Sequence, residues 1–274
     1  MIPAQFEYEV AGSVEEAIEL LGSREDAKLL AGGHSLIPAM KLRIARPGTL
    51  VDIGRIDGLS YVREDGDAIA IGALTRHHDV ATSELLRERC GIAASAAAEI
   101  GDPQVRHRGT IGGSVSHGDP ASDMPGVLLA LDAEFVAVGP GGERRIPATE
   151  FFTGVFETAL GPQDVLTEIR VPSLGGAGWA YLKFARRKQD WATVGVAAVA
   201  ADGGARVGLV SMGGTPLRAS AVEQALAGGA DPAAAAEKAD EGAEPPSDVA
   251  GSADYRRHLA RVLTRRALEQ ALSD

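Results

Sequence analysis

Helical and strand-like spacings of apolar residues alternate along the first hundred residues. The segment Ser13–Glu16 reads Ser-Val-Glu-Glu, a capping box, and is followed by apolar residues at helical spacing until Gly22. Short apolar runs bounded by turn residues predict strands at Lys28–Ala31, Thr49–Ile53, Ile56–Leu59, Tyr61–Arg63 and Ala68–Gly72. Further helices are predicted at Leu36–Arg43, Thr75–Ser83 and Leu85–Ala98.

The pattern changes near residue 175. Before it, the spacing predicts a helix from Pro125 to Leu131 and strands at Glu134–Val138, up to Pro147 and at Val165–Val171. Ser173–Gly178 is a glycine-rich link, which we interpret as a domain boundary. After it come three predicted strands, Trp179–Ala185, Val194–Ala201 and Ala205–Met212, and three helices, Ala219–Ala227, Pro232–Ala239 and Ala253–Leu272. Strands and helices segregated in this way indicate an α+β fold.

Composition and charge exclude several classes of protein. The net charge is −11 and no basic stripe exists, which argues against nucleic-acid binding. A single cysteine, Cys90, cannot form an internal disulfide or hold an iron–sulfur cluster. No signal pattern opens the sequence, and no apolar run reaches the ~18 residues of a membrane span. We therefore expect a cytoplasmic protein without a membrane span.

Glycine is in excess, at 34 of 274 residues, and two glycine-rich motifs draw attention. The first, Leu30–Ser35, lies between a predicted strand and helix, where backbone amides and the helix dipole favour an anion. The second, Thr110–Ser114, repeats the same residue types about 78 residues later. Each alone is equally typical of a tight turn, but together they favour a diphosphate ligand held without any arginine. Neither a G-x-G-x-x-G fingerprint nor a P-loop is present.

Four segments in order carry a family resemblance. AGGHSLIPAMKLRIARPGTLVDIGRI (31–56) and TIGGSVSHGDPASDMP (110–125) resemble the two flavin-binding segments of the medium subunit of aerobic carbon monoxide dehydrogenase and related molybdenum hydroxylases. GWAYLKFARRKQDWATVGVA (178–197) and PPSDVAGSADYRRHL (245–259) are similar to parts of that family's C-terminal domain. The resemblance implies a two-subdomain FAD-binding domain over 1–175, of the vanillyl-alcohol-oxidase-like (PCMH) type and split near residue 55. It also implies a C-terminal domain over 176–274, with a three-stranded antiparallel sheet and helices.

The resemblance further implies noncovalent FAD, with its diphosphate between the two glycine motifs. Asp123 matches an acidic residue on the cofactor and suits a ribose hydroxyl or the adenine amine. Lys183 matches a lysine near the isoalloxazine, where a cation would stabilise negative charge at N1/C2=O. Ile100 and Leu166 match apolar contacts, and Trp191 is a candidate to cover the ring. The full set of predicted cofactor-binding residues is Leu30, Ala31, Gly32, Gly33, His34, Ser35, Leu36, Ile100, Thr110, Ile111, Gly112, Gly113, Ser114, Asp123, Leu166, Lys183 and Trp191.

The implied function is that of an oxidoreductase subunit without catalytic side chains or metal ligands of its own. It would pass electrons from the [2Fe–2S] clusters of a small subunit to an external acceptor such as a quinone, dioxygen or NAD, while a large molybdopterin subunit oxidises the substrate. Two alternatives stay open, a free-standing FAD-dependent oxidoreductase and a non-enzymatic diphosphate-binding module. His34 also leaves covalent flavin attachment open, because a Gly-Gly-His sequence occurs in covalent-flavin oxidases. His77 and His78 are expected in a solvated helical turn rather than at a metal.

Overall fold

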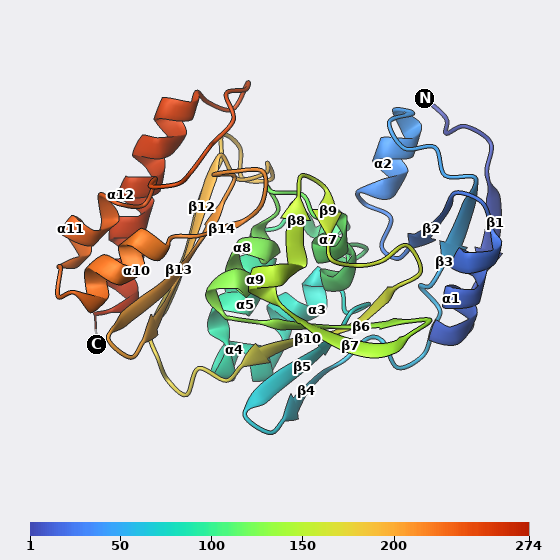
Figure 1. Cartoon of the computed structure of the whole chain (residues 1–274), viewed down its shortest axis with the longest axis horizontal. Coiled ribbons are helices and arrows are strands. Elements are labelled where there is room, and N and C mark those ends of the chain that lie inside the picture. The colour runs from blue at the N-terminus through green and yellow to red at the C-terminus, as the bar shows by residue number, and fades with distance from the viewer. Residues whose placement is uncertain (274) are drawn as a thin grey trace.

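A small parallel sheet forms the N-terminal part of the protein (Figure 1). The computed structural model describes residues 1–273. The strand order is β1-β3-β2, with β1 at Glu7–Val10, β2 at Ala27–Leu30 and β3 at Thr49–Asp52. Helices α1 (Val14–Ser23) and α2 (Leu36–Lys41) follow β1 and β2. The Ser13 hydroxyl accepts a hydrogen bond from the Glu16 amide, so the predicted cap is confirmed.

A five-stranded antiparallel sheet follows, in the order β4-β5-β10-β6-β7. Its strands are β4 (Val62–Asp65), β5 (Ala68–Gly72), β6 (Glu134–Gly139), β7 (Gly142–Pro147) and β10 (Val165–Pro172). Strands β8 (Phe152–Gly154) and β9 (Glu157–Thr158) form a separate hairpin. The strand expected at Ile56–Leu59 is wrong. The Ile56 amide donates to the Ile53 carbonyl in a turn, because this apolar segment packs into the small N-terminal core instead of pairing with a strand.

Within residues 1–273, seven helices lie between β5 and the C-terminal sheet or beside β7, and all of them except α6 contribute side chains to the main core. They are α3 (His77–Thr82), α4 (Glu84–Arg89), α5 (Gly91–Ala98), α6 (Pro103–Arg106), α7 (Ile111–His117), α8 (Asp123–Ala130) and α9 (Ala148–Phe151). The single helix predicted over Leu85–Ala98 is broken at Cys90, whose backbone leaves the helical region. The break lets Gly91 lie against the Trp179 ring, where an added Cβ would lie 2.5 Å from a ring carbon.

The C-terminal part is an antiparallel sheet covered by helices (left in Figure 1). Its strands are β11 (Trp179–Phe184), β12 (Val194–Ala201), β13 (Gly204–Val210) and β14 (Leu217–Arg218), and its helices are α10 (Ser220–Ala227), α11 (Pro232–Ala236) and α12 (Ala253–Ala271). The three predicted strands are present, and β14 adds a two-residue edge strand. No helix within residues 1–273 has both the length and the apolar composition to cross a membrane.

The C-terminal sheet is buried on both faces. Along β12, Ala197 and Val199 belong to the main core, whereas Val196 and Ala198 belong to the core beneath α12. This explains why β12 is an almost continuous apolar run rather than an alternating one. Gly126 of α8 and Gly208 of β13 allow the two elements to touch, because a Cβ on Gly208 would lie 2.1 Å from the Gly126 carbonyl oxygen. The sheet therefore packs closely against the helices that precede it in the chain. This packing places β11 next to α5 and β12 next to α8.

Candidate functional site

The first glycine motif lines a cleft at the carboxyl ends of the parallel strands. This cleft has a volume of about 640 Å³, and its floor includes the segment from Leu30 to His34. Tyr8 from β1 and Asp52 from β3 also line it. Ligands of open sheets that contain parallel strands bind at this edge, where the loops that follow the strands converge. The sequence thus places a glycine-rich turn where the topology leaves room for a ligand.

The backbone amides of this turn are suited to bind an anion. Among the hydrogen bonds of residues 1–273, none is donated by the amides of Gly32, Gly33, His34 or Ser35. Gly33 has a φ of +77°, a left-handed conformation that reverses the chain and favours glycine. The Ser35 hydroxyl accepts no hydrogen bond from an amide of α2, and within residues 1–273 it donates none. Four amides and one hydroxyl in succession form a set of donors suited to phosphate oxygens.

Basic side chains surround the cleft. Arg55, Arg76 and Arg108 line it together with Lys41 at its rim. The Arg76 guanidinium donates to the Arg108 carbonyl, which fixes both residues beside the turn. The cleft thus offers arginine side chains beside the glycine motif, which the sequence patterns did not predict. The three arginines come from three separate loops, so no local pattern could reveal them, although Arg55 follows β3 by three residues.

The second glycine motif lies against the first. A Cβ on Gly32 would lie 2.3 Å from the Arg108 carbonyl oxygen, and one on Gly113 would lie 3.8 Å from the Ala31 Cβ. The motif forms the start of α7, with the Thr110 hydroxyl accepting from the Gly113 amide. The structure thus brings together two motifs that are far apart in the sequence.

The amides of Ile111 to Ser114 in the second motif, however, are already paired. Ile111 and Gly112 donate to the carbonyls of Thr75 and Ala73, and Ser114 donates to Thr110. The expectation that Thr110–Ser114 repeats the free-amide chemistry of the first loop is wrong. The carbonyls of the turn before α3 accept hydrogen bonds from amides in the first turn of α7. The motif packs against the first loop, and the Ser114 hydroxyl hydrogen-bonds that of Ser122 at 2.8 Å, while cofactor binding by Thr110–Ser114 remains a prediction.

A buried ion pair lies where α8 meets β11. The Lys183 ammonium is 2.9 Å from an Asp123 carboxylate oxygen, and both side chains are about 95% buried. The Tyr181 hydroxyl donates to the other oxygen of Asp123, and Lys183 also donates to the Glu99 carbonyl at 3.1 Å. Alternation along β11 explains the arrangement, since Tyr181 and Lys183 project from the same face of the strand.

Burial raises the pKa of the Asp123 carboxyl, while the Lys183 charge and the Tyr181 hydrogen bond act in the opposite direction. Burial, together with the neighbouring Asp123 charge, also raises the pKa of Tyr181 well above its ordinary value, so Tyr181 is neutral and acts as the donor. The predicted contacts of Asp123 with a ribose hydroxyl or the adenine amine, and of Lys183 with the isoalloxazine, remain predictions.

The three apolar candidates lie in different surroundings. Ile100 follows Glu99 and is partly buried, and its carbonyl accepts from the Arg106 guanidinium at 2.9 Å. Leu166 is a core side chain on β10 that is 5% exposed. Trp191 lies in the loop between β11 and β12 with 65% of its surface exposed. Ile100 directly follows Glu99, whose carbonyl accepts from Lys183, whereas Leu166 packs in the main core and Trp191 lies at the surface.

The histidines also differ from one another. His34 is exposed at the cleft, with its Nε2 3.3 Å from the Gln104 carbonyl oxygen. His77 is only 4% exposed, contrary to the expected solvated turn, because its ring packs under Gly109. Burial lowers the pKa of His77 to about 4, with the charges of Arg106 and Arg76 acting in the same direction. The imidazole is therefore neutral near pH 7.

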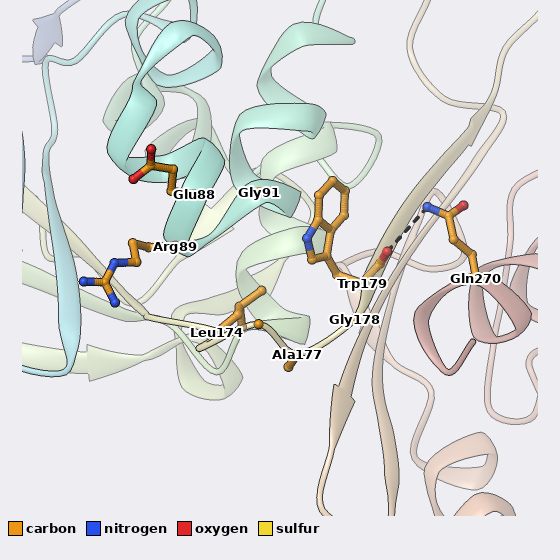
Figure 2. A pocket seen from close by; sticks show the side chains of 9 residues that line it. Glu88, Arg89, Gly91, Leu174, Ala177, Gly178, Trp179 and Gln270 are labelled. Carbon is orange, nitrogen blue, oxygen red and sulfur yellow. Dashed lines mark hydrogen bonds between the residues drawn. The ribbon is translucent and has the colours of Figure 1, made fainter. Parts of the chain in front are cut away.

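A second, smaller crevice lies at the link between the two parts of the chain (Figure 2). Its volume is about 340 Å³, and its walls include Gly91, Leu174 and Trp179. Figure 2 shows the Gln270 amide directed toward the Trp179 carbonyl, across the gap between α12 and β11. None of the predicted cofactor-binding residues lines this crevice.

A cleft with free loop amides and a basic rim, at the carboxyl edge of a parallel sheet, defines a protein that binds a phosphorylated ligand. A family model described as "FAD binding domain in molybdopterin dehydrogenase" matches residues 4–174, and one described as "CO dehydrogenase flavoprotein C-terminal domain" matches residues 179–271. The chain therefore belongs to the family of flavoproteins of the molybdopterin dehydrogenases.

Three relatives illustrate how far the likeness extends. The chain is 45% identical to the carbon monoxide dehydrogenase medium chain of Hydrogenophaga pseudoflava over 99% of this chain and 98% of that one. It is 42% identical to subunit alpha of the 6-hydroxypseudooxynicotine dehydrogenase complex of Paenarthrobacter nicotinovorans, over 99% of this chain and 96% of that one. A solved structure of the Hydrogenophaga pseudoflava carbon monoxide dehydrogenase superimposes with a TM-score of 0.96 at 46% identity, covering 100% of this chain and 99% of that one.

Proposed function

We propose that this protein is the FAD-carrying electron-transfer subunit of a heterotrimeric molybdenum hydroxylase. The observation that carries the proposal is the loop Gly32–Ser35, whose four amides face no partner within residues 1–273 and lie beside three arginines. A diphosphate carries two negative charges and presents many acceptor oxygens, so donors of both kinds suit it. Membership of a family of FAD-binding subunits supports FAD as the molecule that carries this diphosphate.

The cleft fits FAD by its construction as well as its charge. Gly32 packs so closely on the Arg108 carbonyl that a side chain would separate the two loops. The floor of the cleft is therefore bare backbone, which a phosphate can approach within hydrogen-bond distance. Noncovalent binding agrees with the hydrogen bond that His34 makes to the Gln104 carbonyl.

The residues of this chain would bind and orient the cofactor and balance its negative charge. Bound FAD supplies one- and two-electron redox chemistry, which lets it mediate between single-electron donors and two-electron acceptors. The amides of the first loop, with Arg76 and Arg108, would hold the diphosphate. Lys183 holds a positive charge in a buried place beside Glu99 and Ile100, and Asp123 and Tyr181 fix its ammonium. No side chain need transfer a proton for this role.

The electrons must come from another protein. The only cysteine of the sequence, Cys90, is buried, and a [2Fe–2S] cluster needs four ligands. The proposed partners are a small subunit that carries two [2Fe–2S] clusters and a large molybdopterin subunit, and the proposed acceptor is an external oxidant. We also propose that the FAD-binding domain spans residues 1–175, with subdomains divided near residue 55, and that the C-terminal domain spans 176–274. The positive φ angles of Gly175 and Gly176 in the link support this division.

Anaerobic spectroscopy tests the proposal. The purified chain is loaded with FAD, and the flavin absorbance is followed after substrate is added to the chain alone and to the complex with both partner subunits. We expect bleaching only in the complex, because only the complex holds clusters that can deliver electrons. Equal bleaching by the lone chain would indicate a free-standing FAD-dependent oxidoreductase. A chain that takes up no FAD would indicate a diphosphate-binding module.

A further inference from the structure

Two large aliphatic side chains are exposed where α2 ends. Leu42 is 57% exposed and Ile44 is 79% exposed. Single exposed apolar residues are common on folded proteins and have no special meaning. These two, however, lie on either side of a residue with a strained backbone, Arg43, and the three residues together break two local rules of helix ends.

The first broken rule is the choice of arginine at position 43. Arg43 has a φ of +60°, a left-handed conformation in which glycine is the usual residue. The Arg43 amide donates to the Met40 carbonyl at 2.9 Å. The Ile44 amide donates to the Ala39 carbonyl, also at 2.9 Å, which completes a Schellman motif. The helix thus ends in a turn built for glycine, although the sequence supplies an arginine.

The second broken rule concerns Ile44. In a Schellman motif, the residue at this place often makes an apolar contact with the last turn of the helix. Ile44 is instead mostly in solvent. A strained residue and an uncovered apolar one persist together in a folded protein where function requires them.

Helix α2 itself has little of this chain to pack against. Of its six residues only Met40 is buried, and within residues 1–273 none of its apolar side chains belongs to a core cluster. An isolated helix of this length is not stable in water. Ile37 and Pro38 line the cleft of the first glycine motif, whereas Leu42 and Ile44 line no part of it. Figure 1 shows α2 at the edge of the N-terminal part, where another protein can reach it.

The charge at this end of α2 is positive and has no counterpart. No Asp or Glu occurs within residues 27–51, although the chain has 38 of them and a net charge of −11. Within residues 1–273, none of Lys41, Arg43 and Arg46 forms a salt bridge. The Arg46 guanidinium donates to the Arg43 carbonyl at 3.2 Å, which keeps the two arginines together. A partner that covers this surface must therefore supply carboxylates as well as apolar area.

We propose that the α2 end surface, made of Leu42–Ile44 and Arg46, is the docking surface for the small iron–sulfur subunit, which meets it with an acidic and partly apolar face. The inference rests on the proposed function, because it takes that subunit as the source of electrons. The same helix lines the cofactor cleft with Ile37 and Pro38, so a protein on the α2 end surface is separated from the cleft by about one helix diameter, ~10–12 Å. An electron donor needs this proximity, whereas a subunit that only oxidises the substrate does not.

The first measurement is the affinity of the full, FAD-loaded chain for the purified small subunit. Ile44→Glu removes an apolar contact and repels carboxylates of the partner. Its matched control is Val249→Glu, which changes an aliphatic residue of the C-terminal part that is 92% exposed. We expect Ile44→Glu to bind the small subunit about 30-fold more weakly than the control, the effect of losing a residue central to an interface. FAD affinity should not change, because Ile44 does not line the cleft.

The second measurement separates docking from folding. Arg43→Gly relieves the left-handed strain, so the thermal midpoint of the chain should rise by about 2–4 °C. Its affinity for the small subunit should fall about two- to fivefold at low salt, and the difference from wild type should shrink at high salt. The control is Asp26→Gly, because Asp26 also has a positive φ, +48°, and lies outside the α2 end surface. This control should gain stability without losing affinity, so a purely structural role for Arg43 would make the two variants behave alike.

The outcomes separate this inference from the proposed function. If both variants bind the small subunit as their controls do, the inference is overturned and the proposed function stands. Loss of the large molybdopterin subunit with the small subunit retained would also overturn it, as would a wild-type chain that forms a dimer which Ile44→Glu abolishes. A wild-type chain that binds FAD but not the small subunit would contradict the proposed function, and this inference with it.

Discussion

Replacing Gly32 by alanine is the sharpest test of whether the cleft binds FAD. A Cβ at this position would lie 2.3 Å from the Arg108 carbonyl oxygen and 2.8 Å from the Gly109 Cα. Ordinary contact begins at 3.4 Å, so the first loop and the segment before α7 must separate by about 1 Å. Both obstacles are backbone atoms, and neither can rotate away as a side chain would. The methyl group thus changes the geometry of the cleft without changing its charge.

The expected effect follows from the hydrogen bonds that the shift would break. A hydrogen bond to a charged group contributes about 1.5–3 kcal/mol, so losing one or two amide contacts to the diphosphate costs about 2–5 kcal/mol. The dissociation constant for FAD should rise roughly 30-fold to a few thousand-fold. The fold should lose only about 1–3 kcal/mol, as for other overpacked sites.

Titration of the FAD-free chain with FAD, followed by flavin fluorescence, measures the affinity, and circular dichroism with a thermal melt monitors folding. Gly141→Ala is the matched control, because a Cβ there meets no atom within 4 Å and the site is a turn far along the chain from the cleft. A folded Gly32→Ala variant that binds FAD as tightly as the control would refute the reasoning. The two glycine-containing segments would then be structural turns only.

Three further predictions concern buried charge and the mode of attachment. Because burial lowers the pKa of His77 from 6.5 to about 4, the unfolded state binds more protons, and the free energy of unfolding should rise by about 3 kcal/mol between pH 4 and 6.5. Urea denaturation across this range should show a smaller rise for His77→Gln, and an identical rise would contradict the assignment. Lys183→Met should cost about 3–5 kcal/mol by leaving the Asp123 carboxylate buried and unpaired, and adding Asp123→Asn should restore most of it; an unchanged urea midpoint in the single variant would argue against the pair. Acid precipitation of the FAD-loaded chain should release the flavin into the supernatant, whereas flavin in the pellet would indicate covalent attachment at His34.

Local patterns in the sequence predicted the features that depend on neighbouring residues. The cap at Ser13 needs only a hydroxyl three residues before an amide, and the turn at Gly33 needs only a residue that tolerates positive φ. Periodicity predicted most of the strands and helices in the same way, but not α6, α7, α9, β8 or β9. Both glycine motifs were visible because glycine next to a helix start is a local signal.

Tertiary structure decided what those motifs do. The amides of the first loop donate no hydrogen bond within residues 1–273, whereas Ile111 and Gly112 of the second donate to the carbonyls of Thr75 and Ala73. No pattern within 110–114 indicates this difference. The basic rim and the pair of Asp123 with Lys183 likewise join residues from separate loops and strands. A hydrogen-bond donor is committed or free according to which acceptor the fold brings within about 3 Å. The sequence by itself therefore determined the kind of site and the family, and the three-dimensional packing determined which atoms are left to bind a ligand.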